Sequence, residues 1–332
     1  MTAIVLGDAG ILNISVLATL IFWGAWGVFD KLALKEAPPV LVLIAINCLA
    51  PLVPPLTYWA MMVDGQEVCL EPQVFFWTFL AGFSYFVSMV LYLWVLNKTE
   101  ASLVLGLTSC YPVVLQFFSH FFLGEALVFE RIVGSVFVAF GIVVMGLSAR
   151  RLDREGSLNL SAGVWLAILG ATLLWGVWGV FDKKAIELSS AFEVLFCKSI
   201  WDLVFVSVLS SMVAFTVFSK NRRVLKNFGS LFNLDKDAEG VEPGTFFSPL
   251  KTKSLMIPAL MSSICLYAGG LTYLLALSRA TASYVIVITG CYPLVMYIFA
   301  LVILKERFNR TRLIGIILIT IGALLTQVTS SC

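Results

Sequence analysis

Apolar runs long enough to cross a lipid bilayer recur along the whole chain. A membrane-spanning helix needs about 20 mostly apolar residues, because the hydrocarbon layer of a bilayer is about 30 Å thick. Runs of this kind lie at 11–31, 40–63, 74–96, 101–123, 131–149, 162–182, 191–219, 254–277, 281–304 and 312–328. The chain has 332 residues, of which 60% are hydrophobic and 13% charged, and these are too few charges to cover a soluble surface. The sequence therefore predicts an all-α integral membrane protein with ten transmembrane helices.

The bulk properties of the chain exclude several other classes of protein. The alternation of apolar and polar residues that is typical of a transmembrane β-barrel is absent. A net charge of +2 gives no electrostatic reason to expect a nucleic-acid partner. The seven cysteines include no C-x-x-C pair, and one histidine without clustered carboxylates does not suit an enzyme site. We therefore expect no catalytic residues, no metal site and no cofactor.

Two sequence segments in the first part of the chain are repeated, with few changes, in the second part. WGAWGVFDK at 23–31 returns as WGVWGVFDK at 175–183, and ASLVLGLTSCYPVV at 101–114 returns as ASYVIVITGCYPLV at 282–295. The sequence thus predicts two homologous halves of five helices each, at 11–149 and 162–328. The second half is longer because of a charged stretch at 220–253, which we interpret as a hydrophilic loop.

An odd number of helices in each half predicts an inverted repeat. The second half then enters the membrane from the opposite side, an architecture typical of transporters that bind their substrate at the repeat interface near the membrane midplane. Lys and Arg gather in the loops after the first, third, fifth, seventh and ninth predicted helices. By the positive-inside rule these loops are cytoplasmic, which predicts that both termini are non-cytoplasmic.

The repeated motifs resemble the EamA repeat of the drug/metabolite transporter superfamily. Its W-G-x6-K pattern matches Trp23, Gly24 and Lys31, and again Trp175, Gly176 and Lys183. Its turn before a Gly-rich fifth helix is matched by LGEALVFER at 123–131 and LKERFNRTR at 304–312. The resemblance implies ten helices, a central cavity between the halves, and export or exchange of small metabolites. Some relatives, including nucleotide-sugar carriers, are described with both termini cytosolic, in contrast to the charge distribution of this chain.

The first repeated motif predicts an aromatic face on each of two helices. Trp23, Trp26 and Asp30 recur at helical spacing, and Trp175, Trp178 and Asp182 repeat the pattern. One interpretation is a cavity wall that includes Trp26 and Trp178. The alternative is a belt of tryptophans at the lipid headgroups, with lysines that extend out of the hydrocarbon. Each carboxylate near a helix C-terminus needs a partner, and we expect a gate or helix-end role for Asp30, Lys31, Asp182 and Lys183.

Lys198 and Asp202 form the most informative ionisable pair of the sequence. They are four residues apart in the predicted helix 191–219, about 10 and 16 Å from its start. Each such charge near a helix centre costs about 2.5–3.5 kcal/mol on insertion. We predict a site for substrate or coupling ion, and the alternative is a structural ion pair between the two. The family resemblance implies a basic residue near the position of Lys198.

Two prolines predict interrupted helices. Pro112 and Pro293 have no N–H for the carbonyls of Thr108 and Thr289, which therefore need another donor or a ligand. A bend needed only for packing is the alternative. The remaining polar candidates for the cavity are Asn47, Tyr85, Tyr111, Tyr267 and Tyr292.

These features together favour a secondary transporter that works by alternating access. Lys198 is the one Lys or Arg deep in a predicted span, so we expect a neutral, zwitterionic or singly anionic solute, such as an amino acid, and not a phosphate ester. The alternatives are a nucleotide-sugar or organic-phosphate exchanger and a non-transporting membrane scaffold. The expected partners are membrane lipid and a small-molecule substrate, with a coupling proton or counter-substrate left open. The sequence does not set the membrane or the oligomeric state.

Overall fold

The fold of the described chain is entirely helical. The computed structural model describes residues 8–65, 71–124, 129–154, 161–218 and 246–325, and within these ranges it contains no β-strand. The all-α prediction is confirmed. Most of the predicted loop at 220–253 lies outside the described residues.

The helices follow the predicted order, with more interruptions than predicted. The first half comprises α1 (Asp8–Ala33), α2 (Pro39–Ala45), η1 (Ala50–Leu52), α3 (Val53–Val63), α4 (Pro72–Lys98), α5 (Ala101–Thr108), α6 (Tyr111–Leu123) and α7 (Phe129–Arg154). The second half comprises α8 (Ala162–Ile186), α9 (Ala191–Phe218), η2 (Ser248–Lys251), α12 (Lys253–Leu277), α13 (Ala282–Thr289), α14 (Tyr292–Val302) and α15 (Arg310–Leu325).

Seven helical segments in the described ranges are long and apolar enough to cross a membrane. They make the chain a multi-pass membrane protein, but the predicted count of ten spans is not confirmed. The predicted span 131–149 lies within one continuous helix, α7, whereas the predicted span 281–304 is divided into α13 and α14. The last predicted span, 312–328, begins within α15, and its final residues lie outside the described part of the chain. The residues of 281–304 remain apolar across the interruption between α13 and α14, so apolar composition alone does not show where these helices end.

Proline determines several of these stops. Pro112 and Pro293 lie in the first turns of α6 and α14, where a missing N–H leaves no hydrogen bond unmade. The predicted span 40–63 is also interrupted, because α2 ends at Ala45 and α3 begins only at Val53. Pro51 lies in η1, between these two helices. The sequence contains a signal for this interruption in three prolines, Pro51, Pro54 and Pro55, although 40–63 was predicted as one span.

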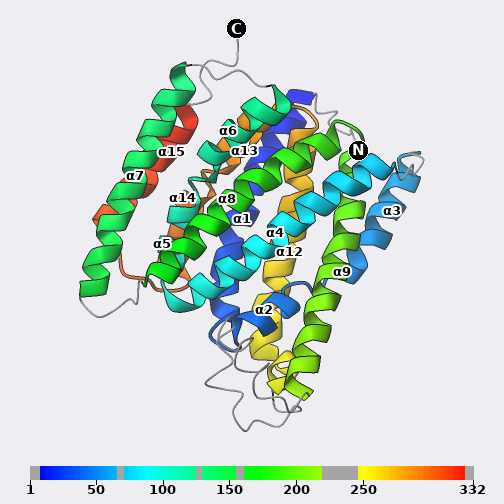
Figure 1. Cartoon of the computed structure of the whole chain (residues 1–332), viewed down its shortest axis with the longest axis horizontal. Helices are drawn as coiled ribbons and strands as arrows, with labels where there is room; N and C mark the ends of the chain where they lie inside the picture. Colours follow the sequence, from blue (N-terminus) through cyan, green and yellow to red (C-terminus); the bar gives the residue numbers. More distant parts are fainter. Residues whose placement is uncertain (1–7, 66–70, 125–128, 155–160, 219–245, 326–332) are drawn as a thin grey trace, which may run out of the picture.

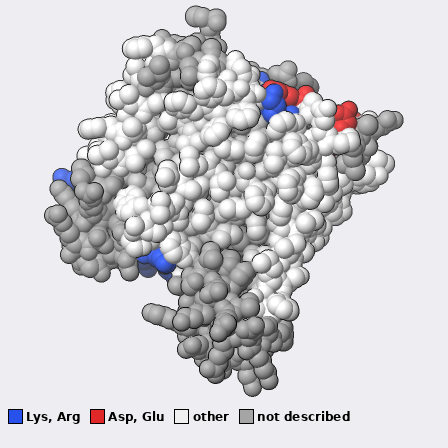
Figure 2. Space-filling model, in the orientation of Figure 1, with Lys and Arg blue, Asp and Glu red and all other residues white. Residues whose placement is uncertain are grey.

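The surface of the molecule suits a lipid environment. Figure 2 shows one broad face with very few charged side chains, which lie at its margins. Large apolar side chains are exposed, among them Phe121, Phe215 and Leu166, each about 70% exposed. An exposed apolar surface of this extent marks contact with membrane lipid or another apolar partner.

The two halves are interlaced by equivalent contacts. Helix α1 packs along α12, and its counterpart α8 packs along α4. In the same way α1 contacts α14, and α8 contacts α6. Figure 1 shows α7 and α15 side by side at one edge of the molecule. Each half thus packs mainly on the other.

The glycines of the repeated W-G motif allow these close approaches. A Cβ added at Gly24 would lie 2.7 Å from Val295 of α14, and one added at Gly176 would lie 2.6 Å from Val114 of α6. Val114 and Val295 are themselves equivalent positions of the second repeated motif. The two repeated motifs therefore pack on each other across the halves in two equivalent contacts.

The turn before α15 ties the second half to the first. The Glu306 carboxylate accepts hydrogen bonds from the backbone N–H of Ala101 at 3.0 Å and from the Ser102 hydroxyl, at the start of α5. Arg312, almost fully buried, contacts Glu100 and Glu306. These charges stabilise the N-terminus of α5, where unpaired N–H groups favour a carboxylate.

We predict that Gly141→Ala destabilises the α7–α15 pair. The added Cβ would lie 2.8 Å from the carbonyl oxygen of Gly315 and 2.9 Å from the nitrogen of Ile319. Both are backbone atoms, so no change of side-chain rotamer can relieve the clash. The expected loss is about 1–3 kcal/mol, measured by unfolding of the purified protein in detergent. Gly163→Ala is the matched control, because its nearest atoms are 3.8 Å away. Equal effects of the two substitutions would contradict the prediction.

Candidate substrate cavity

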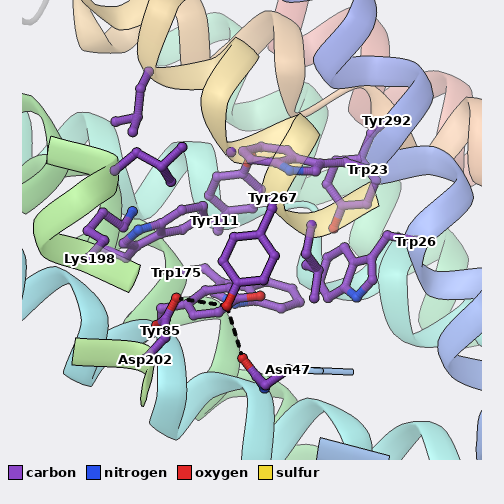
Figure 3. Close-up of a pocket in the computed structure, with 15 residues that line it drawn as sticks. Trp23, Trp26, Asn47, Tyr85, Tyr111, Trp175, Lys198, Asp202, Tyr267 and Tyr292 are labelled. Atoms are coloured by element: carbon purple, nitrogen blue, oxygen red, sulfur yellow. Dashed lines mark hydrogen bonds between the residues drawn. The ribbon is translucent and has the colours of Figure 1, made fainter. Parts of the chain in front are cut away.

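A cavity lies where the two halves meet, and helices of both halves line it (Figure 3). It encloses about 780 Å³ of space free of atoms, a volume that includes the solvent space on its open side. Its lining residues are Trp23, Trp26, Asn47, Tyr85, Tyr111, Trp175, Trp178, Leu195, Lys198, Asp202, Leu266, Tyr267, Gly270, Leu274 and Tyr292.

Nine of the eleven residues predicted to line a cavity or bind substrate lie around this cavity. They are Lys198, Asp202, Asn47, Trp26, Trp178, Tyr85, Tyr111, Tyr267 and Tyr292. Thr108 and Thr289 do not line it, and their hydroxyls donate to carbonyls one turn back, at 2.9 Å to Val104 and 2.8 Å to Val285. That the lining residues bind a substrate remains a prediction.

The aromatic wall is built by the two copies of the first motif packing on each other. Trp23 lies 5.8 Å from Trp178, and Trp26 lies 5.9 Å from Trp175, between ring centroids. The interplanar angles of these two pairs are 47° and 67°. Rings at such distances and inclined to each other are in favourable contact. The same face of each motif therefore contributes to one shared wall.

Two tyrosines that follow the helix interruptions close this wall at equivalent places. Tyr292 meets Trp23 edge to face at 6.2 Å, and Tyr111 meets Trp175 in the same way at 6.3 Å. The interruptions start α6 and α14 at these tyrosines. A break in each helix thus places an aromatic side chain at the cavity.

Lys198 is paired with Asp182 of α8. Its Nζ atom donates to both carboxylate oxygens of Asp182, at 2.8 and 2.7 Å, and Asp182 is fully buried. The expected alternative, a structural pair between Lys198 and Asp202, is not formed among the described ion pairs. Asp182 is fully buried, so an unpaired charge there would cost more than one on Asp202, which lines the cavity. Helix α8 is close enough for Lys198 to reach Asp182.

Asp202 makes one long hydrogen-bond contact and interacts electrostatically with Lys198. The hydroxyl of Tyr267 lies 3.5 Å from Asp202 Oδ2 and 3.4 Å from Asn47 Oδ1, as the dashed lines of Figure 3 show. A single hydroxyl proton cannot serve both acceptors fully at once. The Asp202 carboxylate is therefore weakly satisfied where it meets the cavity.

Asp30, the counterpart of Asp182, has a neutral partner. The Ser262 hydroxyl of α12 donates to Asp30 Oδ1 at 2.6 Å, and Asp30 is fully buried. Both oxygens of Asp182 thus accept from a cation, whereas Asp30 has a hydrogen-bond donor at Oδ1 and none at its buried Oδ2. Neither is among the lining residues of the cavity.

The two motif lysines bind the ends of neighbouring helices. Lys31 donates to the carbonyls of Leu96 and Thr99, at 2.6 and 2.7 Å. Lys183 donates to the equivalent carbonyls, those of Leu277 and Ala280, at 3.1 Å each. A cation at the last carbonyls of a helix satisfies them and offsets the helix dipole. A gating role for these helix ends remains a prediction.

Sequence reasoning missed some residues of the site. Trp23 and Trp175 share the predicted face of Trp26 and Trp178, so helical spacing could have added them to the candidates. Ser262 was not identified, and it lies 232 residues from Asp30. Only the packing of α1 on α12 brings these two side chains together.

Comparison with known proteins gives a family and a fold. The sequence pattern described as the EamA-like transporter family matches residues 10–147 and 161–328. No curated protein matches the chain. Of 28 matching chains of solved structures, one described only as "Crystal structure of protein" has a TM-score of 0.62 and 15% identity, over 95% of this chain and 96% of that one. At that identity the likeness shows a shared fold.

We predict that Lys198 is coupled energetically more strongly to Asp182 than to Asp202. Lys198→Met leaves the Asp182 charge buried and unpaired, which should cost about 3–5 kcal/mol of unfolding free energy. Addition of Asp182→Asn should restore most of this stability, whereas addition of Asp202→Asn should restore little. Two double-mutant cycles in detergent measure these coupling energies. A larger coupling to Asp202 would show that the pairing assigned here is wrong.

Proposed function

The chain belongs to the EamA-like transporter family, and we propose that it is a secondary transporter that carries a small, non-phosphorylated solute by alternating access. The observation that carries this proposal is the cavity, whose aromatic wall combines one copy of the repeated motif from each half. A site shared by two homologous halves can be opened to either side as one half rocks against the other.

The equivalent contacts between the halves support the alternating-access part of the proposal. Each of these helix pairs has a counterpart when every helix is replaced by its equivalent in the other half. The α1–α12 pair corresponds to α8–α4, and the α1–α14 pair corresponds to α8–α6. In an inverted repeat, the contacts made on one side of the membrane can therefore be re-formed by their counterparts on the other side. We propose that the two halves are inverted in this way.

The charges of the cavity support a solute without a phosphate group. Phosphate dianions are held by several converging cations, whereas Lys198 is the one Lys or Arg among the lining residues and is already bound to Asp182. This disfavours the alternative of a nucleotide-sugar or organic-phosphate exchanger. A non-transporting scaffold would not need a charged, aromatic cavity between its halves.

We predict saturable counterflow of a labelled amino acid by the purified protein in proteoliposomes. Trp178→Ala should reduce this flux about tenfold or more, because the indole forms part of the cavity wall. The matched control is Trp165→Ala on the same helix, since Trp165 is not among the lining residues. Flux that rises linearly with concentration for every metabolite class tested would contradict a carrier function.

A second prediction concerns the inverted placement of the halves. Lys35 follows α1 and Glu187 follows α8 at equivalent positions, and both side chains are exposed. In a chain without its native cysteines, Lys35→Cys and Glu187→Cys should react with a membrane-impermeant thiol reagent from opposite faces of the membrane. Labelling of both from the same face would rule out the inverted repeat.

A further inference from the structure

The one cation of the cavity wall is not available to a substrate. Lys198 donates two hydrogen bonds to Asp182, at 2.7 and 2.8 Å, and its side chain is 12% exposed. An anionic ligand would have to displace a fully buried carboxylate from its cation. That displacement would leave Asp182 unpaired in a region of low dielectric constant, which is strongly unfavourable.

The carboxylate of the cavity wall, Asp202, forms no ion pair among the described residues, although the charge of Lys198 acts on it from a greater distance. Among the described residues Lys198 pairs with Asp182, and the nearest hydrogen-bond donor to Asp202 is the Tyr267 hydroxyl at 3.5 Å. A carboxylate in a membrane protein interior is costly unless it meets a cation or strong donors. The lining of the cavity therefore offers a negative group that a cationic ligand would satisfy.

The rest of the wall suits a cation as well. Four tryptophans and four tyrosines line the cavity. The faces of such rings attract ammonium groups within about 6 Å of their centroids, more strongly where water is excluded. The protein itself shows this contact, because Lys198 Nζ lies 4.9 Å from the centre of the Trp178 ring. An ammonium group is therefore already held against one of these rings.

We propose that the cavity recognises a cationic ammonium group, held by Asp202 and the surrounding aromatic rings, on a ligand with an apolar body. The inference rests on the transporter function proposed above and narrows its substrate class. The apolar body follows from the lining, in which Leu195, Leu266 and Leu274 accompany the rings.

The test uses four probes that share a phenyl ring and differ in charge. They are 2-phenylethylamine, a cation; 2-phenylethanol, neutral; 3-phenylpropionate, an anion; and phenylalanine, a zwitterion. Binding is measured by calorimetric titration of the full chain in phosphatidylcholine nanodiscs, with empty nanodiscs as the blank. The amine should bind about tenfold or more tightly than the alcohol and the propionate, from the added contacts of its charge.

Variants of Asp202 test the role of the carboxylate. Asp202→Asn should weaken binding of the amine about tenfold or more while leaving binding of the alcohol unchanged, and Asp202→Glu should retain binding of the amine. The control is Glu193→Gln, which removes another carboxylate of α9 that does not line the cavity. If Asp202→Asn fails to fold, the four probes on the unaltered chain and on Asp202→Glu still decide the question.

The outcomes separate this inference from the proposed function. Absence of amine binding, tighter binding of the propionate or the alcohol, or an unchanged affinity in Asp202→Asn would overturn the ammonium site. If counterflow of another probe persisted in that case, the carrier function would stand. Selective binding of the amine without counterflow of any probe would support the ammonium site and contradict the carrier function.

Discussion

A charge within the hydrocarbon layer must find its partner inside the protein, and much of this structure is arranged around that requirement. Asp182 is fully buried and takes the ammonium group of Lys198, and Asp30 takes the hydroxyl of Ser262. Lys31 and Lys183 bind carbonyls at helix ends. Each partner lies on another helix, so these contacts hold the repeated motif in place. They join α1 to α12 and α4, and they join α8 to α9 and α12.

The duplication acts through contacts between the halves. The tryptophans of one motif copy pack on those of the other, and the motif glycines admit valines from the opposite half. A shared cavity follows from this packing. The halves differ in their charges, however, because Lys198 has only Ile46 and Asn47 at the corresponding place. This difference leaves Asp30 with a neutral partner and Asp182 with a cation, so the cavity is symmetric in its rings and asymmetric in its charge.

Helical periodicity predicted the parts of the site that depend on one helix. It placed Trp26 on one face with Asp30 and Trp178 on one face with Asp182, whereas the all-α class came from the length of the apolar runs. It did not give the partner of Lys198, because spacing along α9 suggests Asp202, whereas the burial of Asp182 on another helix decides the pairing. Apolar length also overestimated the continuous spans, since a run such as 281–304 stays apolar across the stop between α13 and α14. Contacts such as Asp30 with Ser262 depend on tertiary packing, which local spacing does not contain.

The central claim is that the cavity between the halves is the transport path, and a cysteine at Gly270 tests it directly. Gly270 lines the cavity, and a Cβ added there would have no atom within 4 Å, so a cysteine fits without displacing a neighbour. In a chain without its native cysteines, Gly270→Cys should lose saturable counterflow once a bulky, membrane-impermeant thiol reagent has reacted. Gly163→Cys, at an exposed position outside the cavity, should keep its flux after the same treatment. Undiminished flux through fully labelled Gly270→Cys would contradict the account.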